Sequence, residues 1–270
     1  MSWCLEALQI SKQGWYHQKQ DTSIQDEKIK DEIEAILTVS PYYGYRRVTH
    51  ELRRQGKQYN HKRILRIMGE YYLIQPKKIR RNPRTTNSNH KLIVYSNEIK
   101  YLGTVIPGWV WVADVTYIPV AHRWCYLALI MDQSSRKIVG WSLQDHMRKE
   151  LCIEALQMAL QNNPAPKYHH SDRGVQYCSY DYIDILKDNS ITPSMADTGV
   201  SVDNPHAESL NRSIKVEEVY LNYYETLEEA RECIGQYISC YNTKRLHSSL
   251  GYMPPLEFEA HHYSTLANIA

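Results

Sequence analysis

The chain has 270 residues, of which 23% are charged, and its formal net charge is +2. This length exceeds one average domain, so we expect a large domain joined to a smaller one. No apolar run approaches the ~20 residues of a membrane helix, and the first residues lack a signal-peptide pattern, so we expect no membrane partner. The six cysteines form no Cys-x-x-Cys pair, which disfavours a zinc site and favours a reduced, cytoplasmic protein.

Positive and negative charges are distributed unevenly along the chain. Residues 1–100 carry 19 Lys and Arg against 10 Asp and Glu, a net of +9, whereas residues 101–270 carry 13 against 20, a net of −7. A basic first part suggests a module that binds a polyanion, and an acidic second part suggests a site built from carboxylates. Two unrelated solvated surfaces would give the same asymmetry.

Three short helices are expected in the basic part, at residues 28–37, at residues 45–54 and after Asn60, which caps the third. Ser40-Pro41 ends the first helix and Gly56 ends the second. The third helix begins with a basic outer face formed by Lys62, Arg63 and Arg66. Short helices joined by tight turns are typical of a helix-turn-helix module, although a plain helical bundle with a solvated basic face has the same pattern.

A second basic segment follows these helices directly. It contains no acidic residue, and its prolines at positions 76 and 83 oppose helix formation. We therefore predict a helix-turn-helix region at residues 1–75 and an extended DNA-contacting linker at residues 76–100. The expected phosphate contacts of the linker are Lys77, Lys78, Arg80, Arg81 and Arg84.

The chain beyond residue 100 predicts an α/β domain. Strands are expected at residues 109–119, 124–131 and 137–143, followed by a helix at 148–161 and a short strand ending at Asp172. Next come a helix capped by Ser179, a strand at 191–195 and a helix opened by Asn204-Pro205; a capping box then starts the last long helix at Thr226. This order is that of a ribonuclease-H-like mixed sheet flanked by helices, assigned to residues 101–225, with a C-terminal helix and tail at 226–270.

Three carboxylates stand out because they lie on separate elements. Asp114 interrupts an apolar strand, Asp172 ends another strand, and Glu208 lies on a helix, with 35 residues between the last two. Acids in buried strands are rare unless something pairs with them, and hard divalent cations prefer oxygen ligands. The pattern predicts a metal-dependent phosphoryl-transfer site. Asp132 is a rival acid, but the turn after it favours a turn-capping role.

The motifs around these acids resemble the catalytic core of the retroviral-integrase superfamily and, more narrowly, bacterial insertion-element transposases of the insertion-sequence-three family. In the core the matching segments are DVTY at 114–117, HSDRGVQY at 170–177 and DNPHAES at 203–209. YGYRR at 43–47 resembles the helix-turn-helix region of those transposases, and YNTKRLHSSLGYMP at 241–254 resembles their C-terminal signature. The matches run in the expected order over nearly the whole chain.

The resemblance implies that Asp114, Asp172 and Glu208 are a catalytic triad that binds two Mg²⁺ ions, for which Mn²⁺ can substitute. It also implies that Lys215 contacts DNA near the scissile phosphate, and helical spacing places Arg212 beside it. The alternative is that both basic residues lie on the surface and form ion pairs with nearby glutamates. The implied activity is cleavage and strand transfer at insertion-element ends. The alternatives are a catalytically inactive regulator that only binds DNA and a metal-dependent nuclease of the same fold.

The implied partners are double-stranded DNA, namely the terminal repeats of the element and its target, and further copies of the chain assembled on DNA. A fusion or partnership with an upstream helix-turn-helix product is also implied. His169 and His170 are interpreted as structural residues or as residues that support the carboxylates without binding the metal. Arg245 and His247 either act on DNA or lock the terminal segment onto the core, and the sequence does not decide between these roles.

Overall fold

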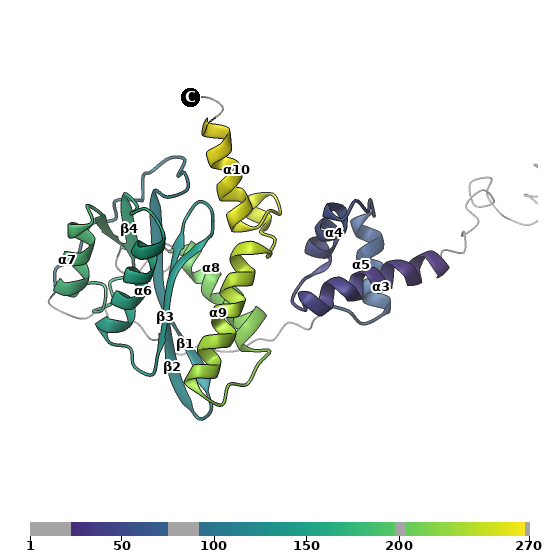
Figure 1. Ribbon diagram of the computed structural model, residues 1–270, viewed down its shortest axis with the longest axis horizontal. Coiled ribbons are helices and arrows are strands. Elements are labelled where there is room, and N and C mark those ends of the chain that lie inside the picture. Colours follow the sequence, from purple (N-terminus) through teal and green to yellow (C-terminus); the bar gives the residue numbers. More distant parts are fainter. Residues whose placement is uncertain (1–22, 75–91, 198–203, 268–270) are drawn as a thin grey trace, which may run out of the picture. The chain divides into compact units, whose positions relative to one another are not determined.

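The protein is described here by a computed structural model that places residues 23–74, 92–197 and 204–267 (Figure 1). The chain divides into two compact units, Met1–Lys77 and Lys78–Ala270. Within the described residues, no helix is long and apolar enough to cross a membrane. The basic linker residues predicted to contact phosphates, Lys77, Lys78, Arg80, Arg81 and Arg84, lie outside the described residues.

The described residues of the first unit form the three expected helices: α3 (Ser23–Val39), α4 (Tyr45–Arg54) and α5 (His61–Glu70). The Asn60 side chain caps α5 by accepting a hydrogen bond of 2.9 Å from the backbone N–H of Lys62. Gly56 ends the turn after α4 with a φ of +81°, a conformation that favours glycine. The inner faces form a small apolar core that includes Ile29, Ile33, Val48, Leu52, Ile64, Ile67 and Met68.

The second unit is built on a five-stranded sheet with the order β3-β2-β1-β4-β5. Its strands are β1 (Val110–Val120), β2 (Arg123–Asp132), β3 (Ile138–Gln144), β4 (Tyr168–Ser171) and β5 (Thr192–Met195). The first three strands pair antiparallel, whereas β4 is parallel to β1 and β5 is parallel to β4. Every strand expected beyond residue 100 is present, with bounds shifted by about one residue, which confirms the ribonuclease-H-like mixed sheet.

Helices lie against both faces of this sheet (Figure 1). They are α6 (Lys149–Asn162), α7 (Tyr180–Asp188), α8 (Pro205–Ile214), the π-helix η2 (Lys215–Val219), α9 (Leu227–Thr243), the short 3-10 helix η3 (Ser248–Leu250) and α10 (Pro255–Ala267). The larger core packs α6 and α7 against inward-facing strand residues such as Trp111 and Ala113. Because side chains alternate along a strand, Val112 and Asp114 point to the opposite face of β1.

Gly140 allows the close approach of α6 to the edge strand β3. A methyl group added at Gly140 would lie 2.2 Å from the backbone oxygen of Ala155 on α6. No side chain fits at that distance, so this contact requires glycine.

The helix caps differ in part from those expected. Thr226 and Glu229 form the predicted capping interaction at the start of α9, with a distance of 3.1 Å from the Glu229 N–H to the Thr226 hydroxyl. Asn204 precedes α8 as expected, but its side chain makes no cap hydrogen bond and donates instead to the backbone oxygen of Ala113 at 3.0 Å. The hydroxyl of Ser179 likewise donates to the Gln176 backbone oxygen. The prediction of side-chain caps at Asn204 and Ser179 was therefore wrong.

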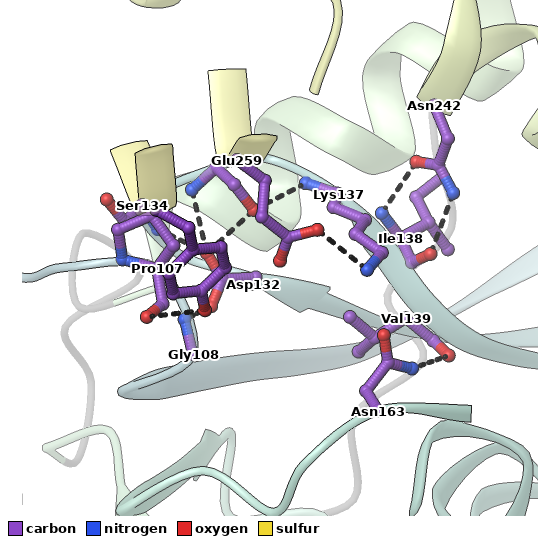
Figure 2. Close-up of polar contacts among 12 residues, drawn as sticks. Pro107, Gly108, Asp132, Ser134, Lys137, Ile138, Val139, Asn163, Asn242 and Glu259 are labelled. Carbon is purple, nitrogen blue, oxygen red and sulfur yellow. Dashed lines mark hydrogen bonds and ion pairs between the residues drawn. The ribbon is translucent and has the colours of Figure 1, made fainter. Parts of the chain in front are cut away.

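The last helix, α10, was not expected, because the residues after the long helix that starts at Thr226 were predicted to form a tail. Pro255 occupies the first helical position, where the missing N–H costs no hydrogen bond. Figure 2 shows how the C-terminal helices hold the edge strand: Asn242 of α9 bonds both the N–H and the C=O of Ile138, each at 2.9 Å. Glu259 of α10 pairs with Lys137 at 2.8 Å. Side chains of α9 and α10 therefore bind the start of the edge strand β3.

The segment from residue 92 onward belongs with the second unit. Leu92 and Tyr95 pack against its core, and the backbone oxygen of Ser96 accepts a hydrogen bond of 3.3 Å from the Met195 N–H at the end of β5. Lys100 pairs with Asp197 at 2.7 Å. The later part of the predicted linker is therefore folded against the α/β domain.

Candidate active site

Strand register brings the first two candidate acids together. Strands β1 and β4 run parallel, with Val110 opposite Tyr168 and Val112 opposite His170. If this register is extended by two residues, Asp172 lies opposite Asp114, at the point where β4 has just ended. Neighbouring strands are ~4.8 Å apart. Both side chains occupy equivalent positions in the pleat and therefore point to the same face of the sheet.

Helix α8 supplies the third acid to this face. Asn204, at its start, is bonded to the backbone of Ala113, and the Asn211 amide donates to Asp114 Oδ2 at 2.7 Å. Glu208 lies three residues before Asn211 and therefore on the same side of the helix. Two asparagines thus fix the helix against β1 and place Glu208 beside Asp114.

The electrostatics of Asp114 show that the acids influence one another. Burial raises the pKa of Asp114 to about 7, and the negative charges of Asp172 and Glu208 contribute to this rise, against the opposing effects of the Val115 N–H and of Lys215. The N–H of Val115 donates to Asp114 Oδ1 at 2.9 Å. A carboxyl whose pKa is raised by two other carboxylates is typical of a functional site, and a cation would relieve the repulsion.

Asp172 is oriented by the turn that follows it. The N–H of Gly174 donates to Asp172 Oδ1 at 2.9 Å, and a methyl group added at Gly174 would meet that same oxygen at 2.9 Å. A side chain at position 174 would therefore have to displace this carboxylate. Within the described ranges, no three His, Cys, Asp or Glu side chains are close enough together to hold a metal ion as they stand. The exposed Glu208 side chain would have to turn toward the two aspartates to complete such a site.

The two basic residues after Glu208 differ in their surroundings. Lys215 is buried, with 6% of its surface exposed, and its ammonium nitrogen lies 3.9 Å from the ring centroid of Tyr117. Burial lowers the pKa of Lys215, and the charge of Asp114 acts in the opposite direction. Arg212, four residues after Glu208 on α8, is exposed. The alternative of a surface pair is therefore wrong for Lys215, which adjoins the acids.

The basic residues of α5 also differ from one another. Lys62 is exposed at the start of the helix. Arg63 and Arg66 both pair with Asp26, which is 6% exposed, at 2.8 and 2.6 Å. These two arginines therefore hold α5 against α3, a role that the sequence did not indicate. Lys62 is exposed and Arg63 is partly buried, while Arg66 is exposed although it pairs with Asp26.

The side chains interpreted as structural do have structural contacts. Asp132 is 1% exposed and accepts hydrogen bonds from the N–H groups of Ser134, Ser135 and Gly108, so its turn-capping role is confirmed. His169 bonds the Tyr182 hydroxyl, and burial lowers its pKa to about 3. His170 bonds the Ser194 hydroxyl. None of these contacts involves the three acids.

Arg245 and His247 lock the terminal segment onto the core. Arg245 is 2% exposed and binds both carboxylate oxygens of Glu217, at 2.5 and 2.6 Å. Its third nitrogen donates to His247 Nε2 at 2.7 Å. A guanidinium buried in this way favours the locking role for Arg245, whereas His247 is only partly buried.

Two residues of the site, Asn211 and Gly174, were not identified from the sequence. The signal for Asn211 is its place between the buried Leu210 and Ile214 on the inner face of α8, where a polar residue needs a partner. The signal for Gly174 is its position two residues after an acid that ends a strand. Neither signal indicates which atom the residue contacts.

Comparison with known proteins agrees with this arrangement. Integrase core domain models match residues 105–201 and 189–255, and an HTH-like domain model matches residues 24–82. The chain is similar to the insertion element IS600 uncharacterized 31 kDa protein of Shigella sonnei, with 37% identity covering 96% of this chain and 98% of that protein. It is also similar to the transposase InsF for insertion sequence IS3A of Escherichia coli K12, with 33% identity covering 96% of this chain and 88% of that protein.

A solved structure shares the fold at low sequence identity. It is the simian T-cell lymphotropic virus intasome in complex with the PP2A regulatory subunit B56 gamma, with a TM-score of 0.51, 12% identity, and coverage of 84% of this chain and 74% of that chain. This likeness concerns the fold alone. The identity to the insertion-element proteins extends over almost the whole of both chains, so the chain belongs to the IS3 family of insertion-element transposases, with an integrase core and an HTH-like region.

Proposed function

We propose that this transposase cleaves DNA strands at insertion-element ends and transfers them to a target in a Mg²⁺-dependent reaction, with Asp114, Asp172 and Glu208 as the catalytic triad. The observation that supports this most directly is the electrostatic coupling of three acids from β1, from the end of β4 and from α8. Three negative charges beside an apolar strand lower the stability of the fold, because buried charges are costly and like charges repel. Their grouping is therefore better explained by function than by folding.

The residues fit a hard divalent cation by their chemistry. Three carboxylates offer the oxygen donors that Mg²⁺ prefers, with Mn²⁺ as a substitute, and their repulsion is relieved when a cation binds. When bound, Mg²⁺ would polarise the scissile phosphate and lower the pKa of a water molecule. Asn211 and the Val115 N–H hold the Asp114 carboxylate in place, and the Gly174 N–H holds that of Asp172. The buried ammonium of Lys215 adds positive charge where a DNA phosphate would approach.

The HTH-like unit is proposed to bind the terminal repeats of the element. Lys62, exposed at the start of α5, contacts DNA in this proposal, together with the linker from Lys77 to Arg84. Arg63 and Arg66 would do so only by exchanging Asp26 for a phosphate. Since joining two ends requires two DNA segments to be held together, the working form is a multimer on DNA. An upstream helix-turn-helix product is a further proposed partner.

The test is a cleavage and strand-joining assay on DNA that carries the ends of the element, with and without Mg²⁺. Asp172→Asn and Glu208→Gln keep the side-chain shape but lose the charge, so each should abolish cleavage while binding to the ends persists. Asp132→Asn is the matched control, because it changes a buried acid of the same sheet outside the site. Cleavage by either triad variant at the wild-type rate would remove that residue from the proposal.

A further inference from the structure

The helix that carries Glu208 changes from an α-helix to a π-helix at Lys215. Helix α8 ends at Ile214, and the π-helix η2 begins at Lys215. The Tyr220 N–H closes this turn by bonding the Lys215 backbone oxygen, five residues back, at 2.8 Å. Single π-turns within α-helices are uncommon and often lie at functional sites. The extra residue in the turn changes the direction in which Lys215 and the residues after it project.

Glu217, two residues after Lys215, anchors this turn to the C-terminal part of the chain. Its carboxylate is 7% exposed and accepts two bonds from Arg245, at 2.5 and 2.6 Å. The Tyr237 hydroxyl of α9 donates to the same carboxylate at 2.8 Å. Arg245 also donates to the Ser213 hydroxyl, one turn before Glu217, at 3.3 Å. The guanidinium therefore contacts both sides of the point where the α-helix becomes a π-helix.

The position of the Lys215 side chain depends strongly on a fixed backbone. A lysine side chain is long and flexible, and its ammonium group is strongly hydrated. Here it is buried, and the contacts that hold its end are the Tyr117 ring and the negative charge of Asp114. Once its backbone shifts, the same side chain can reach water and leave both contacts. A fixed backbone at Lys215 is thus a condition for an ammonium group beside the catalytic acids.

We infer that Arg245 and Glu217 are positioning residues for the transposition reaction: their buried ion pair fixes η2 so that Lys215 stays beside Asp114. This inference rests on the proposed function, because it assigns a role to Lys215 in that reaction. It gives the C-terminal signature a task that requires no contact with DNA. His247 contributes by accepting a hydrogen bond from the remaining nitrogen of Arg245.

The test replaces the pair as a whole, since removing one partner would leave a buried charge and unfold the protein. The variant Glu217→Leu with Arg245→Met keeps the volume and removes both charges. At saturating end DNA and Mg²⁺, its single-turnover cleavage should be about 10–100-fold slower than wild type, because small misplacements cost this much. Its affinity for end DNA should stay within about twofold. The matched control is Lys137→Met with Glu259→Leu, which removes the ion pair of α10 (Figure 2) and should leave the cleavage rate unchanged.

A second comparison separates positioning from general damage. In a Lys215→Ala background, the pair variant should slow cleavage by no more than about a further twofold, because its effect passes through Lys215. A full additional loss, or a folded pair variant that cleaves at the wild-type rate, would overturn the inference. Should the pair variant fail to fold, Tyr237→Phe removes one hydrogen bond to Glu217, and it must show a smaller loss with the same dependence on Lys215.

The same assay distinguishes this inference from the proposed function. If Asp114→Asn cleaves like wild type, the proposed triad is wrong. If Asp114→Asn is inactive but Lys215→Ala cleaves at the wild-type rate, the triad stands and the positioning role is refuted.

Discussion

The substitution Asp114→Asn is expected to stabilise the metal-free protein while it abolishes activity. The Asp114 carboxyl is largely buried and lies near two other acids, and together these raise its pKa from 3.8 to about 7. An asparagine has the same shape without the charge. Among the described residues, the buried Asn211 Oδ1 has no hydrogen-bond partner, so a flip of this amide would let it accept a bond from the amide introduced at position 114.

The size of the effect follows from linkage between protonation and folding. The unfolded carboxyl loses its proton near pH 4 and the folded one near pH 7, so the free energy of unfolding falls as pH rises through this range and is level above it. A shift of about three pH units corresponds to ~4 kcal/mol. Since the side chain is partly exposed, solvent screening reduces this to roughly 1–3 kcal/mol. The Asp114→Asn variant does not lose this stability, so its Tm at pH 8 should be about 2–12 °C above that of the wild type.

The assay is thermal unfolding in a chelator between pH 5 and pH 8, repeated with excess Mg²⁺. At a Mg²⁺ concentration of 100 times its Kd, binding stabilises the wild type by ~2.7 kcal/mol and the variant by less. The difference between the two Tm values should therefore shrink or change sign. Asp145→Asn controls for the loss of one exposed negative charge. A variant with an equal or lower Tm than wild type in chelator at pH 8 would refute this reasoning about the site.

Three further predictions test other parts of the structure. Gly174→Ala should abolish cleavage without unfolding the chain, because the added methyl group displaces the Asp172 carboxylate; wild-type cleavage would contradict this. Asp132→Asn should lower the stability of the second unit by ~1–3 kcal/mol in denaturant unfolding while cleavage persists below the transition, since one acceptor of a buried hydrogen-bonded turn is replaced. Lys62→Ala should weaken binding of end DNA and reduce its salt dependence by about one unit in the log–log slope, whereas an unchanged slope would remove Lys62 from the interface.

Much of the fold could be predicted because its signals are local. Apolar runs with β-branched residues marked the strands, and capping residues such as Asn60 and Thr226 marked helix starts. Asn204 and Ser179 are also common capping residue types, yet their side chains make other contacts. Whether a polar side chain caps its own helix depends on what packs beside it, and the sequence does not give that information. The same limit explains why α10, whose Glu259 pairs with Lys137 of another part of the chain, was missed.

The candidate site was predictable to a different degree for each residue. A charged residue inside an apolar strand is unusual in itself, so Asp114 could be singled out. The resemblance to the transposases pointed to Lys215, but its burial under the Tyr117 ring depends on the π-turn, for which the sequence has no evident signal. The ion pairs of Arg63 and Arg66 could not be predicted for a related reason. Basic residues on a helix look solvent-exposed in sequence, and the acid that neutralises them, Asp26, lies on another helix.

The contacts of the C-terminal segment indicate whether it packs on its own chain or could reach a second copy. Arg245 is engaged with Glu217 of the same chain, and Asn242 satisfies the backbone of the edge strand at Ile138. A segment with these buried contacts would have to break them before it could reach a second subunit. We therefore place it within the catalytic unit of its own chain. In the proposed multimer, contacts between copies would then come from surfaces that remain exposed when this segment is in place.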